Sequence, residues 1–478
     1  MLILLLCIHP LFITPNIYIQ LTHHKFIFFL FCMITLSCFT IPILLYQSLQ
    51  GFRVLEKKPS LTHLTLIGFL LVTILSAILS PYKTEMNVWL GAEERYDGVI
   101  TQVLYIAVFL IIACWYKVRE RDFLLFAVSV SVVSLIGILQ AYKIYNFGPG
   151  PGDVMDTRGI QFLSTLGNIN MVSAYACIAV LFCGFLFIRT DWSLRYIWLV
   201  TSLLCFWLLI IAASFSGLVG TAAAVMLAIP FLIENRQYFS RFLILIFGWV
   251  SVFTLHRFLY NTLILGGGYG KFLPFAFIMV VIGVVTLAVI LKSKNIKPGG
   301  KINWKLGITL IAVLIITGII FVEIFGRAED GLVYQAREIM HGNIDDEFAT
   351  KRVYIWRNAL SVMMERPVIG SGPDTFGYVF PIKAQYFYDV FYDKAHNEYL
   401  QILICQGFLG LILYLVFLFI LFTKSILPAS KNPLLMAALA AFTGFCVQAF
   451  FNISTPIVNP LFWVLAGVMS RLVEHETV

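Results

Sequence analysis

Apolar runs of 17 or more residues recur along almost the whole 478-residue chain, and they restrict the fold more than any other feature. A helix of about that length crosses a hydrocarbon core roughly 30 Å thick. The composition agrees, because 60% of the residues are hydrophobic, only 12% are charged and the mean hydropathy is +0.91. A surface with so few charged groups excludes an ordinary soluble enzyme. The chain is therefore predicted to be an all-α polytopic membrane protein.

Thirteen apolar segments, all but one of them 17 residues or longer, are predicted to be transmembrane helices. They lie near residues 26–47, 62–80, 99–115, 122–141, 169–188, 195–213, 217–233, 242–256, 272–291, 306–325, 399–422, 433–451 and 456–472. Residues 1–19 are also apolar, but they contain Pro10 and Pro15 and have no basic n-region. They look more like a broken fourteenth span than a cleaved signal peptide, and both interpretations stay open. The prediction is thus 13–14 transmembrane helices.

The nine cysteines and the net charge of +8 add little about function. The cysteines are scattered through apolar segments without a CxxC pair, so they are expected to be small hydrophobic residues rather than metal ligands or disulfide partners. The positive charge lies mostly in loops between the apolar runs, which is typical of a membrane protein rather than of a nucleic-acid-binding protein. The sequence predicts no metal, no cofactor and no nucleic-acid partner.

Lysine and arginine are concentrated in alternate loops, and this pattern predicts the orientation. The linker 292–305 has five lysines and no acidic residue, so it is expected in the cytoplasm. Loops on that side, with the C-terminus, hold 18 Lys and Arg residues, against 7 in the short loops of the other side. This places the one long loop, 326–398, outside the cytoplasm. The predicted organisation is 1–325 for the first 10–11 spans, 326–398 for a large extracytoplasmic loop, and 399–478 for the last three spans.

The long loop is predicted to be folded and partly helical. It has about 73 residues, with 11 acidic and 8 basic side chains, and it is rich in Trp, Tyr, Phe and Val. Within it, "DDEFATKRVYIWRNALSVMMERP" has the pattern of an amphipathic helix, with Asp345 or Asp346 as N-cap and Pro367 just after its end. The residues expected on its apolar side are Phe348, Tyr354, Ile355, Leu360 and Val362.

Arg352 and Trp356 are i, i+4 neighbours on this helix, so the aromatic ring is expected to hold the guanidinium. An arginine held in this way suits a phosphate group. The alternative is an arginine that extends to the lipid headgroups.

The stretch "KAHNEYLQILICQGFLG" (394–410) joins a polar cluster directly to an apolar run. Asn397 is a plausible N-cap, which puts His396 at the N-terminus of the next span, where unpaired N–H groups and the helix dipole disfavour a charged imidazole. A neutral imidazole there can accept a proton from a hydroxyl, and the helix terminus can hold an anion such as a pyrophosphate. The alternative is an interfacial histidine that only hydrogen-bonds a loop carbonyl.

The stretches "RVYIWRNAL", "PVIGSGPDTFGYVF" and "AHNEYLQILICQGFLGLILYLVFLF", in this order, resemble the signature of the bacterial O-antigen ligase and polymerase superfamily. Its members have an Arg ahead of an IW pair, a GxGPxTF turn and an H-N/D-x-Y-L-Q segment that leads into a GxxGL helix. Two upstream segments, "ERYDGVITQVLYIAVFL" (94–110) and "STLGNINMVSAY" (164–175), resemble its R-x-D-G-L and GN-x-N segments. The resemblance spans roughly residues 90–425, and the predicted topology places all of these segments on the extracytoplasmic side.

This resemblance implies a glycosyltransferase of the bacterial cytoplasmic membrane, surrounded by membrane lipids. Such enzymes transfer a saccharide from an undecaprenyl-pyrophosphate carrier to a hydroxyl on a glycan, lipid or protein acceptor. By motif position, Arg352 would bind the pyrophosphate and His396 would be the general base. The candidate substrate-binding residues are Arg95, Asp97, Asn168, Asn170, Arg357, Asn397, Glu398 and Tyr399. The structural alternatives are that Arg95 and Asp97 pair in a turn, and that Asn168 and Asn170 cap the span that begins at 169.

One position departs from the family pattern. Phe215 in "AASFSGLVG" stands where members usually have an Arg in a Ser-Arg element, and Arg158, Arg257 or Lys271 are possible substitutes. The family-matching segments also lack a DxD-like acidic pair, so metal-independent transfer with inversion at the anomeric carbon is expected.

Two other classes of function remain. A flippase or transporter of lipid-linked glycans typically needs ionisable residues in its spans, and these spans are almost free of charge except for Glu323 near a span end. The other class is a membrane protein that has lost catalysis, which Phe215 keeps open.

Overall fold

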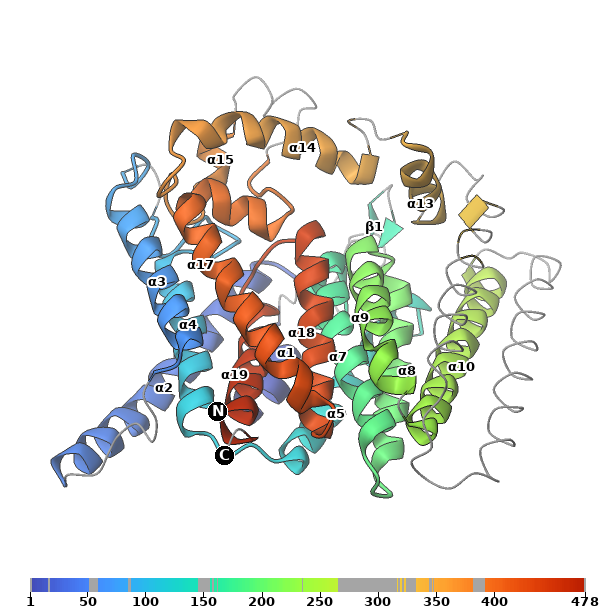
Figure 1. Ribbon diagram of the computed structural model, residues 1–478. Helices are drawn as coiled ribbons and strands as arrows, with labels where there is room; N and C mark the ends of the chain where they lie inside the picture. The colour runs from blue at the N-terminus through green and yellow to red at the C-terminus, as the bar shows by residue number, and fades with distance from the viewer. Residues whose placement is uncertain are drawn as a thin grey trace. The chain divides into compact units, whose positions relative to one another are not determined.

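The computed structural model describes residues 2–15, 18–50, 59–84, 87–144, 155–156, 159–160, 162–233, 235–264, 316, 319, 322–323, 332–343, 346, 348–380 and 392–476. The chain divides into two compact units, and helices dominate both (Figure 1). Unit 1 consists of Met1–Phe126, Ile344–Ala429 and Ala449–Val478. Unit 2 consists of Ala127–Asn343 and Ser430–Gln448.

Unit 1 is built around four apolar helices, with α3 packed along α17 and α4 packed along α19. Its helices are α1 (His9–Leu11), α2 (Leu21–Leu49), α3 (Leu61–Ile78), α4 (Val99–Trp115), α14 (Phe348–Val362), α15 (Phe376–Val379), α17 (Glu398–Ala429) and α19 (Asn459–Glu476). Short helical turns lie at η1 (Ile3–Ile8), η2 (Glu120–Phe123), η5 (Met363–Glu365) and η6 (Ala449–Phe451). In Figure 1, α14 lies across the top of unit 1, beside the start of α17.

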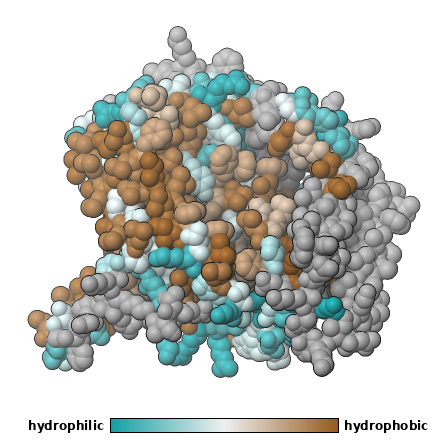
Figure 2. All heavy atoms as spheres, in the orientation of Figure 1, coloured by the Kyte–Doolittle hydropathy of each residue, from teal (hydrophilic) through white to brown (hydrophobic). Residues whose placement is uncertain are grey.

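The helices of unit 1 expose large hydrophobic side chains. On α3, Leu64 and Leu71 are 54% and 62% exposed, and on α17 Ile412 and Phe419 are 53% and 67% exposed. Figure 2 shows hydrophobic residues gathered over these helices, with hydrophilic residues toward the two ends. Lipid tails can cover such a surface at no cost, whereas water cannot. Unit 1 therefore has the surface of a membrane protein.

Unit 2 is centred on α7 (Ile169–Arg189), which packs against α8 (Arg195–Ala212), α9 (Phe215–Ile233) and α18 (Pro433–Gln448). Every residue of α7 from Met171 to Arg189 is buried, as expected for a helix that is apolar on all sides. The unit also contains most of α5 (Leu124–Ala141), with α10 (Arg236–Leu259), η3 (Tyr260–Ile264) and α13 (Leu332–His341).

Four two-residue strands form the β-structure of the described residues. β1 (Met155–Asp156) pairs antiparallel with β2 (Gly159–Ile160), and β3 (Phe162–Leu163) pairs antiparallel with β4 (Gly167–Asn168). In register, Met155 faces Ile160 and Phe162 faces Asn168. β3 and β4 contact α7, and these short ladders do not alter the all-helical class.

The predicted all-α polytopic class is confirmed. Within the described ranges, nine helices are long and apolar enough to cross a membrane, and α4 is a shorter apolar helix. The helical turns at 3–8 and 9–11 are too short to span a bilayer. The predicted span 272–291 lies outside the described residues, and so does nearly all of 306–325. The last predicted span, 456–472, corresponds to α19, which is not among the nine.

Candidate functional site

The turn 367–372 pairs with residues 404–409 of α17 through four backbone hydrogen bonds of 2.7 to 3.2 Å. Gly407 has a φ of 72° and interrupts the helical geometry of α17 at this point. A Cβ on Gly407 would lie 2.3 Å from the carbonyl of Val368, and one on Gly370 would lie 2.4 Å from the carbonyl of Cys405. Only glycine allows both this close approach and the positive φ. The turn is thus fixed against the kink of α17.

Asp374 follows this turn, and its fully buried carboxylate holds a second loop. Its Oδ2 accepts hydrogen bonds from the backbone N–H groups of Ala92 (2.7 Å) and Asp97 (3.3 Å). These bonds fix the loop 91–98, which connects α3 to α4, against the turn. Two motifs that are far apart in the sequence, "ERYDG" and "GSGPDTF", are therefore neighbours in unit 1.

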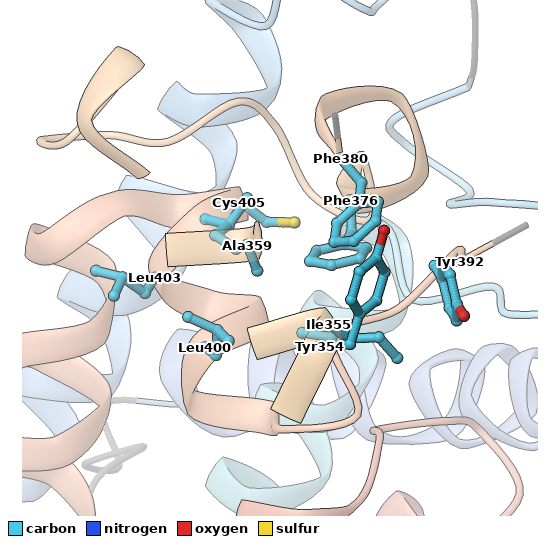
Figure 3. Close-up of a cluster of buried hydrophobic side chains, with 11 residues drawn as sticks. Tyr354, Ile355, Ala359, Phe376, Phe380, Tyr392, Leu400, Leu403 and Cys405 are labelled. Atoms are coloured by element: carbon cyan, nitrogen blue, oxygen red, sulfur yellow. The ribbon is translucent and has the colours of Figure 1, made fainter. Parts of the chain in front are cut away.

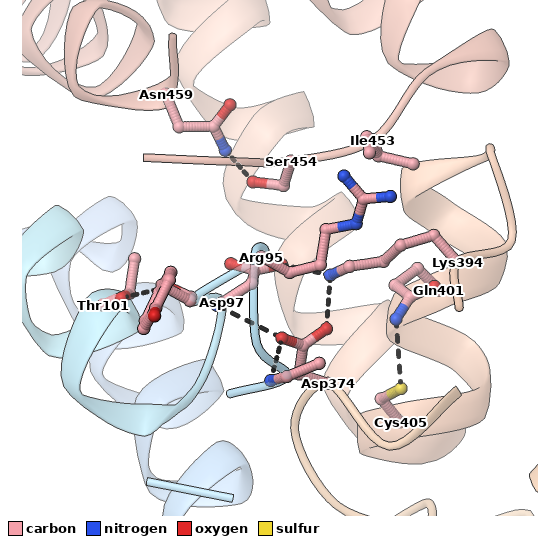
Figure 4. Close-up of polar contacts among 12 residues, drawn as sticks. Arg95, Asp97, Thr101, Asp374, Lys394, Gln401, Cys405, Ile453, Ser454 and Asn459 are labelled. Atoms are coloured by element: carbon pink, nitrogen blue, oxygen red, sulfur yellow. Dashed lines mark hydrogen bonds and ion pairs between the residues drawn. The ribbon is translucent and has the colours of Figure 1, made fainter. Parts of the chain in front are cut away.

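Lys394 completes this cluster. Its side chain is 1% exposed, and its ammonium lies 2.5 Å from Oδ1 of Asp374 and 3.2 Å from Oδ2 of Asp97 (Figure 4). Burial alone would lower the pKa of Lys394, but the two carboxylates outweigh it and raise the pKa above its ordinary value. Burial raises the pKa of Asp97, although Lys394 opposes this shift. Gln102 also donates a hydrogen bond to Asp97, at 2.9 Å.

A small polar cavity lies beside this cluster and has room for about one water molecule. Glu398 lines it, and Oε2 of Glu398 is buried without a hydrogen-bond partner among the described residues. Glu398 therefore faces the interior of unit 1. The other polar side chains of the lining are Asp97, Gln102, Asp374, Gln401, Gln406, Ser454 and Asn459.

Arg95 pairs with Asp393, one residue before Lys394. The Nε of Arg95 donates to Oδ2 of Asp393 at 2.5 Å, with side chains 29% and 26% exposed. Burial would raise the pKa of Asp393, but the guanidinium outweighs it and lowers that pKa. Arg95 and Asp97 thus bind to different partners, so the interpretation that they pair with each other in a turn is not what the structure shows.

His396 lies between this cluster and the start of α17. Its φ is 49°, in the left-handed region that non-glycine residues rarely adopt. The predicted N-cap is confirmed, because the side chain of Asn397 accepts a hydrogen bond from the N–H of Leu400 at 3.1 Å. Nδ1 of His396 is buried and has no hydrogen-bond partner within the described part of the chain. Burial, followed by the guanidinium of Arg352, lowers the pKa of His396 to about 4, so the imidazole is neutral near pH 7.

Arg352 is carried by α14 and is buried, at 7% exposure. Its Nε has no hydrogen-bond partner in the described ranges, and burial lowers its pKa to about 10. Arg352, Ile355 and Ala359 follow at i, i+3 and i+7, so they share one face of α14. Ile355 and Ala359 belong to a hydrophobic cluster that also includes Phe376 from α15 and Leu400 from α17 (Figure 3). This cluster holds the buried face of α14, and Arg352 with it, against the start of α17.

Two predictions about α14 were wrong. Trp356 does not brace Arg352: its ring packs on Phe450 and Phe451, and its Nε1 donates to the carbonyl of Ala395 at 2.9 Å. Leu360 was expected on the apolar side of the helix and is 50% exposed. α14 begins at Phe348 within the described ranges, and Asp345, one of the two predicted N-caps, lies outside the described residues.

Arg357 and Tyr399 were the other predicted substrate-binding residues of this region. Arg357 projects from α14 with its side chain 65% exposed and pairs with Asp346 at 2.9 Å. Tyr399 lies in an aromatic cluster with Tyr414 and Phe450, at ring centroid distances of 6.4 and 6.3 Å. Arg357 and Tyr399 belong to unit 1, as do Arg95, Asp97, Arg352, His396, Asn397 and Glu398.

Asn168 and Asn170 belong to unit 2 and have local structural partners there. The side chain of Asn168 caps α7 by accepting from the N–H of Asn170 at 2.9 Å, as the capping alternative expects. Oδ1 of Asn170 accepts from the hydroxyl of Ser214 at 2.9 Å. Phe215, at the first position of α9, and Arg257 are also in unit 2, whereas Arg158 and Lys271 lie outside the described residues.

Sequence reasoning missed Asp374, Asp393 and Lys394. A signal was available, because all three are charged residues inside or directly beside the family-like motifs of a chain that has few charges. Among the residues that the structure describes, no group of three or more His, Cys, Asp or Glu side chains is arranged to hold a metal ion.

Residues 273–415 match the sequence model of the family described as O-antigen ligase. The matched stretch contains α14, the turn 367–372, Lys394, His396 and the kink at Gly407, whereas Arg95 and Asp97 lie outside it. No curated protein matches the chain.

Proposed function

We propose that this membrane protein, which carries an O-antigen ligase domain over residues 273–415, transfers a saccharide from an undecaprenyl-pyrophosphate carrier to a hydroxyl of a glycan, lipid or protein acceptor. One observation carries the proposal. Nε of Arg352 and Nδ1 of His396 are both buried without a hydrogen-bond partner among the described residues. The segments that carry them are joined by the hydrogen bond from Nε1 of Trp356 to the carbonyl of Ala395, and the guanidinium lowers the pKa of the imidazole. A cation and a base in that relation suit an anionic leaving group and a hydroxyl nucleophile.

The chemistry follows from these two groups. His396 accepts the proton of the acceptor hydroxyl while the hydroxyl oxygen forms a bond to the anomeric carbon of the donor sugar. The bond from that carbon to the pyrophosphate oxygen breaks, and the electron pair stays on the pyrophosphate. Arg352 binds the pyrophosphate and stabilises the charge that develops on it, because a guanidinium can donate two parallel hydrogen bonds to phosphate oxygens. A single displacement of this kind inverts the anomeric carbon.

Other residues contribute to binding. The guanidinium of Arg95 uses its Nε for Asp393 and stays partly exposed, so its terminal nitrogens are candidates for a second contact to the diphosphate. Asn397 fixes the start of α17 beside His396. Asp97, Asn168, Asn170, Arg357, Glu398 and Tyr399 remain proposed substrate contacts. Of these, Asp97 and Glu398 line the interior cavity. They are therefore better placed to maintain the geometry of the site than to contact a sugar.

The reaction is proposed to occur on the extracytoplasmic side of the bacterial cytoplasmic membrane. The distribution of Lys and Arg between loops supports this orientation. No nucleotide sugar is available on that side, so a lipid pyrophosphate is the suitable activated donor. The transfer is proposed to need no metal, because Arg352 supplies the positive charge at the leaving group; a chelator should leave the rate unchanged.

The test is transfer by the purified protein in liposomes that contain an undecaprenyl-pyrophosphate oligosaccharide and an acceptor glycan. Wild type should form a new glycosidic bond, and Arg352→Ala and His396→Ala should each lower the rate by at least about a hundredfold. The matched controls are Arg366→Ala and His341→Ala, since Arg366 is exposed and donates to the carbonyl of Leu79, and His341 is bound to Glu323 at 2.7 Å.

Two outcomes would contradict the proposal. The first is a rate that is unchanged by both Arg352→Ala and His396→Ala. The second is translocation of the lipid-linked saccharide across the bilayer without a new glycosidic bond, which would favour a flippase.

A further inference from the structure

Two consecutive residues just before His396 are bound to the same distant loop. Asp393 pairs with Arg95 at 2.5 Å, and Lys394 pairs with Asp97 at 3.2 Å. Asp374 extends the link, because its carboxylate binds both Lys394 and the backbone of the loop 91–98. The segment 392–397 has no helix or strand of its own, so its path depends on such contacts, together with the hydrogen bonds of Trp356 and Gln401 to the backbone of Ala395.

The Lys394 cluster is not a surface ion pair. The side chains of Lys394, Asp97 and Asp374 are 1%, 8% and 0% exposed. Burying these charges costs desolvation energy that apolar side chains of similar volume would not incur. A cluster of this kind is therefore better explained by the geometry it specifies than by the stability it adds. The geometry here is the position of the backbone two residues before His396.

We propose that Lys394 is a positioning residue for the transfer reaction: its ammonium, shared by Asp97 and Asp374, fixes the segment that carries His396 against the loop 91–98. This inference rests on the proposed role of His396 as the general base. Lys394 itself is too deeply buried to touch the substrate. It acts on the reaction in two ways, by holding the imidazole in place and by balancing the charge of the two carboxylates near it.

The charge balance by Lys394 affects the pKa of His396, and this can be measured as the position of the acid limb of the pH–rate profile. A purely structural role of Lys394 would not move that limb. The charged groups that act on His396 are Arg352, Arg95 and Lys394, which disfavour the imidazolium, and Asp393, which favours it. Without the ammonium, the negative charge of Asp97 and Asp374 is no longer compensated. Because a nearby negative charge stabilises the imidazolium, the pKa of His396 should rise, and the acid limb of the pH–rate profile should move to higher pH.

The experiment compares three variants of the full-length protein in the reconstituted transfer assay. Lys394→Met removes the ammonium and keeps the length of the side chain. Lys394→Met with Asp374→Asn also removes one carboxylate, so the summed formal charge of Lys394, Asp97 and Asp374 stays at −1 (+1 −1 −1 before, −1 after), and asparagine tolerates the φ of 62° at position 374. The matched control is Lys83→Met, because Lys83 is an exposed lysine of the α3–α4 connection that donates to the carbonyl of Ile78.

Lys394→Met should lower kcat by about ten- to a hundredfold, since a misplacement of about 1 Å can cost ~10²-fold, with KM for the donor nearly unchanged. Its acid limb should move to higher pH. The double variant should keep the low kcat, because the tether is absent, but should regain the wild-type acid limb, because the charge is balanced. Lys83→Met should behave as wild type.

Each contrary result overturns the inference. If His396→Ala lowers the rate but both Lys394 variants transfer at the wild-type rate, Lys394 does not position the base and the proposed function stands. If Lys394→Met cannot be purified, the charge-balanced double variant decides, and a wild-type rate in that variant contradicts the inference. If His396→Ala itself keeps the wild-type rate, the proposed function fails and the inference fails with it.

Discussion

Nε1 of Trp356 on α14 donates a hydrogen bond of 2.9 Å to the carbonyl oxygen of Ala395. Trp356 lies one helical turn after Arg352, and Ala395 immediately precedes His396. This bond therefore connects the helix that carries the guanidinium to the segment that carries the imidazole. It gives a physical reason why the guanidinium of Arg352 lowers the pKa of His396, which is 44 positions further along the sequence (396 minus 352).

Trp356→Phe should weaken the proposed transfer while retaining most of the packing. The substitution keeps an aromatic ring against Phe450 and Phe451 but leaves the carbonyl of Ala395 without its donor, at a cost of about 1–3 kcal/mol. We expect kcat to fall by about tenfold and the apparent Tm in detergent to fall slightly. Trp89→Phe is the control, since Trp89 is 45% exposed. Equal kcat values for the two variants would show that the Trp356 bond has no role in the site.

The rate of transfer should be insensitive to pH where an ordinary histidine would titrate. Burial and Arg352 lower the pKa of His396 from 6.5 to about 4, and as the proposed general base this imidazole would act in its neutral form. The rate should therefore fall only as pH approaches about 4. At about pH 5 roughly nine-tenths of the neutral-pH rate should remain, whereas a histidine of ordinary pKa would keep about 3%. A single-turnover pH profile makes the measurement, and an acid limb centred near pH 6.5 would contradict the assignment.

The contact between α17 and the turn 367–372 should make Gly407 one of the least replaceable glycines. Gly407→Ala adds a methyl group 2.3 Å from the carbonyl of Val368, in addition to the strain of a φ of 72°. Gly342 is a matched control, because its φ is 74° and a Cβ there meets nothing within 4 Å. Gly342→Ala should cost only the backbone strain, about 1–2 kcal/mol, and Gly407→Ala substantially more. Thermal unfolding in detergent measures both, and equal losses would show that the close approach is relaxed in solution.

The pair between Arg95 and Asp393 should show measurable coupling. Their N–O distance is 2.5 Å, but both side chains are more than a quarter exposed, so solvent and salt weaken the interaction. A double-mutant cycle with Arg95→Ala and Asp393→Ala should give a coupling of about 1 kcal/mol or less in stability. Because Arg95 lowers the pKa of Asp393, this contribution is present at neutral pH and is lost as pH falls and the carboxylate is protonated. Strict additivity of the two substitutions at neutral pH and low salt would contradict the pairing.

Much of the fold could be predicted from the sequence, because the bilayer imposes a simple rule on length and hydropathy. The predicted span at 169–188 matches α7 (Ile169–Arg189), and the one at 195–213 matches α8 (Arg195–Ala212), each to within one residue. The same rule says little about how helices deviate from regularity. The break in α17 at Gly407 depends on a backbone contact with Val368, and no pattern within the apolar run predicts such a contact.

The part of the site that lies in local sequence motifs could be predicted, whereas the contacts between distant segments could not. His396 and Arg352 lie in local motifs, and local rules such as the Asn397 cap hold for them. The partners of Lys394 are 297 and 20 residues away in the sequence, and only the tertiary fold brings them together. Trp356 failed as a brace for Arg352 because helical spacing gives proximity but not orientation. Its ring packs on Phe450 and Phe451, which are almost a hundred residues further along the chain.

The most direct measurement is an experimental structure of the protein with an undecaprenyl-pyrophosphate saccharide bound in lipid nanodiscs. The account predicts the diphosphate within hydrogen-bonding distance of the Arg352 guanidinium, with the anomeric carbon on the side of the His396 imidazole. A diphosphate bound elsewhere, with Arg352 and His396 both free of substrate, would contradict it.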